Sequence, residues 1–174
     1  MNKTVNPKIW GPYAWHILHN ISINTKITDE TKQNYIDFIN IFQHIIPCPR
    51  CKVNLKEKYL MIPISLDTIT TSNITNWTYT IHNSVNIETN KKEFNYNKHL
   101  EIHKKTNCKK YRKFINILLS VMGDNPSFEE FIRIHTFIIS LYKIYPLKSA
   151  KEFKYFNNYD DISSPSDLIK WFNN

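Results

Sequence analysis

Residues 38–60 read FINIFQHIIPCPRCKVNLKEKYL and place a Cys-x-x-Cys pair between two helix-like segments. The first segment has apolar residues at the spacing of a helix that packs on a core, and Pro47 ends it. Cys48 follows this proline directly, and the second segment starts there. We therefore predict that Cys48 lies at a helix N-terminus, where unpaired N–H groups and the helix dipole favour a thiolate.

The Cys48 and Cys51 pair alone is compatible with two kinds of site. Two cysteines at this spacing can close a small disulfide ring, and they can also supply half of a tetrahedral zinc site. His99 and His103 have the spacing of the other half, although they follow the cysteines at a much longer interval than in a compact zinc finger. In a reducing cytosol such a pair is more often catalytic or metal-binding than a static crosslink.

Helix-like periodicity continues on both sides of this pair. A cap at Thr28-Asp29-Glu30 predicts the start of the helix that ends at Pro47. The other predicted helices cover residues 13–24, 48–59, 73–88, 97–105, 109–122, 127–145 and 166–172. Because alternation typical of strands is short throughout, we predict an all-α protein with one domain at residues 1–108 and a helical extension of unknown role at residues 109–174.

Composition narrows the possible functions. Gly11 and Gly123 are the two glycines, and they are too far apart to form a glycine-rich nucleotide-binding turn. The net charge of +8 is compatible with a basic nucleic-acid-binding module. However, the lysines are scattered, and the abundance of lysine, isoleucine and asparagine can reflect A/T-rich codons. We therefore expect no specific nucleic-acid partner.

The sequence also bears on localisation. The first ten residues lack the apolar centre of a signal peptide. No window reaches the roughly 18 uncharged apolar residues of a membrane span. We therefore predict a cytoplasmic protein with neither a signal peptide nor a transmembrane segment.

Two further motifs flank the cysteine pair. The first is Trp10-Gly11-Pro12-Tyr13-Ala14-Trp15 followed by Leu18-His19, and the second runs from Trp77 to Asn86 as WTYTIHNSVN. On a helix, His82 and Asn86 share a face because they are four residues apart. Such a face, flanked by Trp77, offers an aromatic wall with donors and acceptors, which suits a planar ring system with polar edges.

In order and spacing, the WGPxxWxxLH, PCxxC and WxxxxHNxVN patterns resemble the Erv/ALR family of FAD-dependent sulfhydryl oxidases. The resemblance covers residues 7–105 and is greatest to the compact members found in large DNA viruses. It implies a four-helix bundle plus a short fifth helix, with FAD at the mouth of the bundle, and a homodimer. It also implies a viral protein of the host cytoplasm, which could be packaged in the virion.

The resemblance further implies roles for individual residues. Cys51 would lie next to the flavin, and Cys48 would react with the incoming dithiol. The implied FAD site is lined by Trp10, Trp15, His19, Trp77, His82, Asn83, Val85, Asn86, Lys91, Phe94 and Lys98. Electrons would pass from a thiol substrate through the cysteine pair and FAD to O2, giving H2O2, and no metal would be required.

The chain departs from the family pattern in several places. Tyr79 and Tyr96 occupy the two positions of a structural disulfide found in many relatives, and we expect their rings to pack together. The chain also lacks the second CxxC shuttle of many relatives, so either a dithiol protein substrate or a thioredoxin-like adaptor must deliver electrons. The lone Cys108 is interpreted as a bystander, with an intermolecular disulfide as the alternative.

Two predictions stay open at this level. His103 or His99 would stack on the adenine, where some relatives have another aromatic residue. The extension from residue 109 is compatible with a dimerisation or partner-docking module, and also with a simple helical cap over the core.

Overall fold

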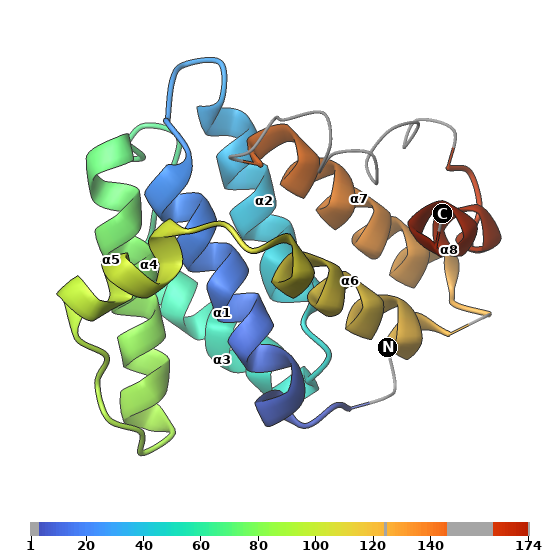
Figure 1. Cartoon of the computed structure of the whole chain (residues 1–174), viewed down its shortest axis with the longest axis horizontal. Helices are drawn as coiled ribbons and strands as arrows, with labels where there is room; N and C mark the ends of the chain where they lie inside the picture. Colours follow the sequence, from blue (N-terminus) through green and yellow to red (C-terminus); the bar gives the residue numbers. More distant parts are fainter. Residues whose placement is uncertain (1–3, 124, 146–161, 174) are drawn as a thin grey trace.

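The computed structural model describes residues 4–123, 125–145 and 162–173 (Figure 1). Within these ranges the chain forms helices and no strand, which confirms the predicted all-α class. The helices are α1 Pro7–Asn24, α2 Lys32–Ile45, α3 Pro49–Met61, α4 Thr71–Glu88, α5 Tyr96–Lys104, α6 Cys108–Met122, α7 Phe128–Ile144 and α8 Pro165–Asn173.

Helix α1 lies at the centre of the molecule. It contacts α4 and α5 on one side and α6 on the other, while α2 packs against α3 and α7 (Figure 1). One apolar core joins these helices, and it includes buried residues from α6 and α7 as well as from the first four helices. The boundary predicted at residue 108 coincides with the start of α6, but the core is continuous across it. Residues 124, 146–161 and 174 of the predicted extension lie outside the described part of the chain.

Two helices begin at places that differ from the prediction. Helix α1 starts at Pro7, because the Asn6 side chain accepts a hydrogen bond from the Lys8 N–H and caps it, so Pro12 lies inside the helix. Helix α2 starts after Thr31 and not at Thr28-Asp29-Glu30. The hydroxyl of Thr31 accepts from the Thr28 N–H, so these residues form a turn before the helix.

The start of α3 agrees with the prediction. Ile46 is extended, as expected of a residue that precedes a proline, so α2 cannot continue through Pro47. Cys48 is the N-cap, Pro49 occupies the first turn, and the Cys48 sulfur accepts from the Cys51 N–H at 3.2 Å. This arrangement confirms that Cys48 lies at a helix N-terminus.

The contact predicted between Tyr79 and Tyr96 is confirmed. Their ring centroids are 4.9 Å apart and the rings meet edge to face, at 87°. Such a contact contributes about 0.5–1.5 kcal/mol beyond the buried area. It therefore connects α4 to the start of α5, the two segments that the family's structural disulfide would join.

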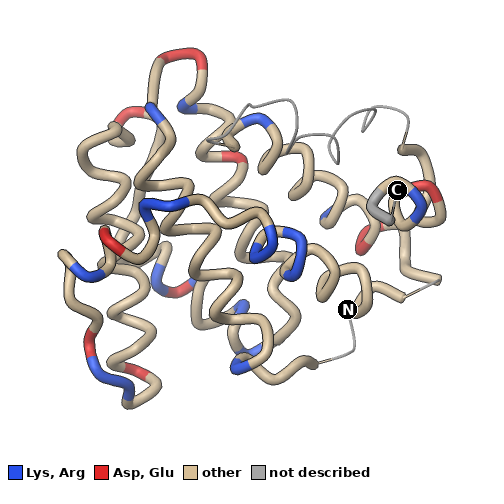
Figure 2. The backbone as a smooth tube through the Cα atoms, viewed as in Figure 1, with Lys and Arg blue, Asp and Glu red and all other residues tan. Residues whose placement is uncertain are grey.

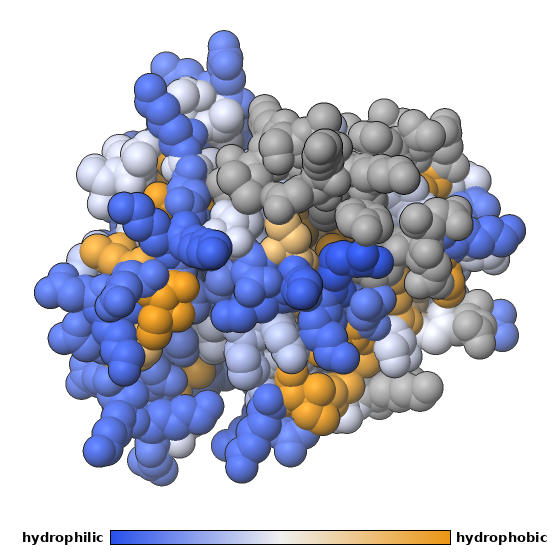
Figure 3. Space-filling view, viewed as in Figure 1, coloured by the Kyte–Doolittle hydropathy of each residue, from blue (hydrophilic) through white to orange (hydrophobic). Residues whose placement is uncertain are grey.

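The surface is largely polar. Figure 2 shows lysine and arginine spread over several elements, with a group that runs from the end of α5 into α6. Figure 3 shows a mostly hydrophilic face on which apolar residues form small separate patches. Among the described helices, none combines the length and the apolar character needed to cross a bilayer.

Candidate functional site

The two cysteines of the CxxC motif form a disulfide in this structure, with a Cα–Cα distance of 5.2 Å. Cys48 is only 6% exposed, and Cys51 is partly exposed. Because disulfide sulfurs are not thiolate ligands, the four-ligand zinc site with His99 and His103 is not formed. The disulfide-forming interpretation of the pair is the one that the structure supports.

Two tryptophans hold the segments around this pair. The Trp10 indole N–H donates to the Val5 carbonyl at 3.1 Å, and the Val5 N–H donates to the Pro47 carbonyl at 2.9 Å. The N-terminal segment is thereby fastened to the turn that precedes Cys48. The indole N–H of Trp77 donates to the Ile62 carbonyl at 2.7 Å, which connects α4 to the end of α3.

Five imidazoles from three helices gather beside Trp15, and we call them the histidine cluster: His16, His19, His82, His99 and His103. Trp15 stacks on His82 with centroids 3.9 Å apart and planes 8° apart. The Nε2 of His19 lies 2.7 Å from the Nδ1 of His82, so one of them donates to the other. The cluster provides flat ring surfaces with ring nitrogens along their edges.

Burial keeps the histidine cluster neutral. It lowers the pKa of His16, His82 and His99 to about 4 and that of His103 to about 3. The pKa of His19 is also well below its usual value, first because of burial and then because of the neighbouring imidazoles. At neutral pH these rings are therefore hydrogen-bonding groups without charge.

Several nitrogens of the cluster are buried and have no hydrogen-bond partner among the described residues. They are Nδ1 of His19, Nε2 of His16 and both ring nitrogens of His99. Since buried polar atoms are nearly always paired, these nitrogens need partners that the described residues do not supply, from ordered water or from a polar group that enters the cluster. A flat group with donors and acceptors along its edge, such as a flavin or an adenine, fits these rings. A metal ion could also bridge His19, His99 and His103, whose ligand atoms lie within 4.8 Å of one another.

The predicted asparagines of α4 shape the segment after that helix. The Asn83 side chain accepts from the Phe94 N–H at 2.9 Å and donates to the Phe94 carbonyl at 3.2 Å. Asn86 is buried beside it, and its backbone carbonyl accepts from the Lys91 N–H at 2.8 Å. These bonds place the Phe94 ring 6.2 Å from those of His82 and His103.

The structure brings together one part of the predicted FAD site. His19 and His82 belong to the histidine cluster, Trp15 and Phe94 lie against it, and Asn83 is hydrogen-bonded to Phe94. Trp77 lies instead against Tyr59, and Trp10 belongs to the same apolar core as Cys48. Val85 is partly exposed, and Lys91 and Lys98 are exposed.

Sequence reasoning missed two parts of this region. His16 gave no signal of its own, but it lies three residues before His19, which is the spacing of one helix face. Asn20 donates to the His103 carbonyl at 2.6 Å and accepts from the Tyr111 hydroxyl at 2.8 Å. Since Tyr111 belongs to α6, outside the three motifs, only the folded structure reveals this connection.

An all-helical fold that carries a CxxC disulfide at a helix N-terminus, together with a cluster of neutral imidazoles, is typical of a thiol-disulfide redox protein. The model of the Erv1/Alr family matches residues 12–109, and the chain belongs to this family.

Curated relatives agree with this assignment. Over 115 residues the chain is 30% identical to a probable FAD-linked sulfhydryl oxidase of Acanthamoeba polyphaga mimivirus, with 64% of this chain and 80% of that relative covered. Over 99 residues it is 28% identical to the FAD-linked sulfhydryl oxidase of African swine fever virus (isolate Warthog/Namibia/Wart80/1980), with 56% of this chain and 82% of that relative covered. No solved structure matches the chain significantly.

Proposed function

We propose that this protein is an FAD-linked sulfhydryl oxidase that forms disulfides in protein substrates through Cys48 and Cys51. The observation that carries the proposal is the disulfide at the N-terminus of α3, in a family whose viral relatives have this activity in their names. The unpaired nitrogens of the histidine cluster support a bound cofactor with a polar edge.

The protein's part in the reaction is thiol-disulfide exchange. A substrate thiolate attacks Cys48, the Cys48–Cys51 bond breaks, and Cys51 leaves as a thiolate while substrate and Cys48 form a mixed disulfide. A second substrate thiolate then attacks the substrate sulfur of that bond and releases Cys48 as a thiolate. The substrate gains a disulfide, and the cysteine pair holds the two electrons.

Helix α3 stabilises the product of this exchange. The Cys51 N–H points at the Cys48 sulfur, and the helix N-terminus carries partial positive charge. Both effects favour Cys48 as a leaving thiolate in the second step. The hydrogen bond from the Val5 N–H to the Pro47 carbonyl holds the turn before Cys48 in place while the Cys48 sulfur exchanges its disulfide partner.

The cofactor site consists of the predicted residues around the histidine cluster. Trp15 and the neutral imidazoles of His19 and His82 would provide ring contacts and hydrogen bonds, and Asn83 would keep Phe94 beside them. When bound there, FAD supplies the redox chemistry that restores the disulfide and delivers two electrons to O2 as H2O2. His99 and His103, one of which we expect to stack on the adenine, are buried in the same cluster and belong to this proposed site.

We propose that the protein acts as a homodimer in the cytoplasm of a virus-infected cell. Packaging in the virion is a further part of this proposal. The similarity to viral relatives supports this setting. The electron donor is a dithiol protein or a thioredoxin-like adaptor, since the sequence holds one cysteine pair and a lone third cysteine.

Two measurements test the function. Purified protein should show the visible absorbance of a bound flavin, and it should consume O2 when dithiothreitol is added. Cys51→Ser should lower O2 uptake by at least about 100-fold, because the variant cannot form the disulfide. Cys108→Ser is the matched control and should keep the activity. A colourless protein, or equal activity in the Cys51→Ser variant, would contradict the proposal.

A further inference from the structure

One face of α3 connects the redox pair to a pocket at the other end of the helix. Pro49, Lys52, Lys56 and Tyr59 are three or four residues apart, so they lie along the same face. A helical side chain covers the turn that precedes its own residue, so Lys52 extends over the turn at Cys48. The face therefore begins at the sulfur that we expect the substrate to attack.

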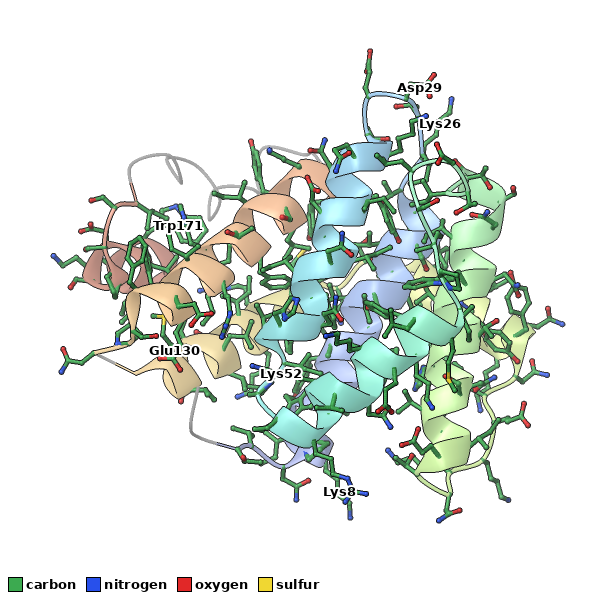
Figure 4. The ribbon with its side chains drawn as sticks, turned by 180° about the vertical axis from the view of Figure 1, so that it is seen from behind. Lys8, Lys26, Asp29, Lys52, Glu130 and Trp171 are labelled. Atoms are coloured by element: carbon green, nitrogen blue, oxygen red, sulfur yellow. A yellow bond between two sulfur atoms is a disulfide. The ribbon has the colours of Figure 1, made fainter. Side chains whose placement is uncertain are left out.

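This face carries excess positive charge. Lys52 is half-buried, and Lys56 is exposed on the next turn. Neither forms an ion pair with a described residue, whereas Lys58 pairs with Glu88, and Arg133 of α7 pairs with Glu129. Figure 4 shows Lys52 on α3, seen from behind.

The charges lie close enough to affect one another. The pKa of Lys52 is lowered by burial and by Arg133. The pKa of His44, on α2, is lowered by burial and then by Arg133, Lys52 and Lys56. A half-buried ammonium without a carboxylate partner is unfavourable, and an incoming anionic group would relieve it.

The face ends at a pocket of about 190 Å³ between α2, α3 and α4. Its lining includes Ile39, Ile64 and Trp77, which are apolar, and Lys56 at its edge. Two polar atoms of the lining are buried and lack a partner among the described residues, namely Oε1 of Gln43 and the hydroxyl of Tyr59. These two atoms can take hydrogen bonds from ordered water or from a ligand that enters the pocket.

The dimensions suit a short piece of polypeptide. Lys52 and Tyr59 are seven residues apart on the helix, or about 10 Å. Three residues of extended chain span about that distance. Leu60, which lines the pocket, is 72% exposed and gives its rim the apolar character of a protein interface.

We propose that the face of α3 from Lys52 to the pocket beside Trp77 docks an acidic segment of the protein that delivers its dithiol to Cys48. This inference rests on the proposed function and specifies its substrate class. Carboxylates of the segment contact Lys52 and Lys56, and an apolar side chain enters the pocket. Charge complementarity of this kind raises the association rate and selects the partner.

Binding tests the docking without any turnover. The probe is a fluorescent peptide with glutamates around one leucine and with serines in place of its two cysteines, added to the oxidised full-length protein. The double variant K52E/K56E should weaken binding at least about 10-fold at about 0.05 M salt, and K52Q/K56Q should lie between it and the native protein. The difference in peptide affinity between the native protein and K52E/K56E should shrink at about 0.5 M salt, because salt screens the charges.

The control variant is K26E/K143E, which changes the net charge by the same amount. Lys26 and Lys143 are exposed, and Figure 4 shows Lys26 at the end of the molecule away from Lys52. The control should bind like the native protein. Equal weakening in both double variants, or tight binding by a lysine-flanked peptide, would overturn the proposal in favour of nonspecific attraction or of a different partner.

Turnover separates this inference from the proposed function. For this measurement the acidic peptide carries its two cysteines again. The ratio of kcat/KM for this peptide to kcat/KM for dithiothreitol should fall at least about 10-fold in K52E/K56E. An unchanged ratio would overturn the docking while the oxidase activity stands. A native protein that binds the acidic peptide in a Lys52-dependent way and oxidises no thiol would instead support docking and refute the oxidase function.

Discussion

At the scale of single residues, the proposed cofactor region depends on histidines that stay neutral. An exposed histidine has a pKa near 6.5, so it gains charge between pH 7 and pH 5. His82 and His99, with a pKa of about 4, remain neutral over that range because burial disfavours the imidazolium. The folded protein therefore binds fewer protons than the unfolded chain below neutral pH.

This difference predicts acid destabilisation. Because the folded pKa values are depressed, the free energy of unfolding should fall as the pH drops from about 6.5 toward about 4. The expected loss is roughly 2 kcal/mol per buried histidine between about pH 7 and pH 5. Urea unfolding of the apoprotein at several pH values measures it.

His99→Asn provides the control for this prediction. Removing one imidazole should make the free energy of unfolding depend less steeply on pH, whatever the variant does to the stability at neutral pH. The slope is therefore the readout and not the absolute stability. A pH dependence equal to that of the native protein would show that His99 does not titrate as its burial implies.

At the scale of elements, α6 is connected by hydrogen bonds to the helices that form the proposed cofactor region. The Tyr111 hydroxyl donates to the Asn20 side chain, which donates in turn to the His103 carbonyl at the end of α5. Both residues are buried, and the two bonds connect α1, α5 and α6. Helix α6 therefore fixes the position of α5 relative to α1.

Tyr111→Phe should weaken that connection. Asn20 would keep a buried oxygen without its partner, and the free energy of unfolding should fall by about 1–3 kcal/mol. Because His103 loses support, the apparent Kd for FAD should rise. Thermal unfolding and flavin titration of the apoprotein measure the two effects. Asn116→Ala, an exposed change on the same helix, should alter neither, and an unaffected Tyr111→Phe variant would contradict the proposed support.

At the scale of the whole molecule, the extension shares the core of the first domain. Phe137 of α7 lies 5.9 Å from Phe38 of α2 between ring centroids, and Phe114 of α6 lies 6.0 Å from Phe42. All four rings are buried. Helices α6 and α7 thus cover the apolar sides of α1 and α2.

Truncation after residue 108 tests whether residues 1–108 form an independent domain. The truncated chain would expose Phe38 and Phe42 to water, and fully burying a large apolar side chain is worth about 1.5–3 kcal/mol. We expect a truncated protein that aggregates or melts without cooperativity by circular dichroism, compared with the full chain. A soluble fragment with a cooperative transition would establish residues 1–108 as a folding unit.

Local sequence was enough to predict most of the elements. Prolines, capping residues and apolar periodicity placed most of the described helices close to their observed ends, and the exceptions are the starts of α1 and α2. In α1 the Asn6-Pro7 cap was passed over in favour of Pro12. The Thr28-Asp29-Glu30 cap was also wrong, because Thr31 uses its hydroxyl in the preceding turn.

Sequence by itself determined the all-α class, the redox pair at a helix N-terminus and the family, because each follows from local spacing. Only the tertiary structure decided that five histidines from three helices meet and that α6 and α7 complete the core. It also decided that Lys52 and Lys56 lack carboxylate partners among the described residues. These properties depend on contacts between residues far apart in the chain, and packing, burial and charge at such contacts exist only once the helices have come together.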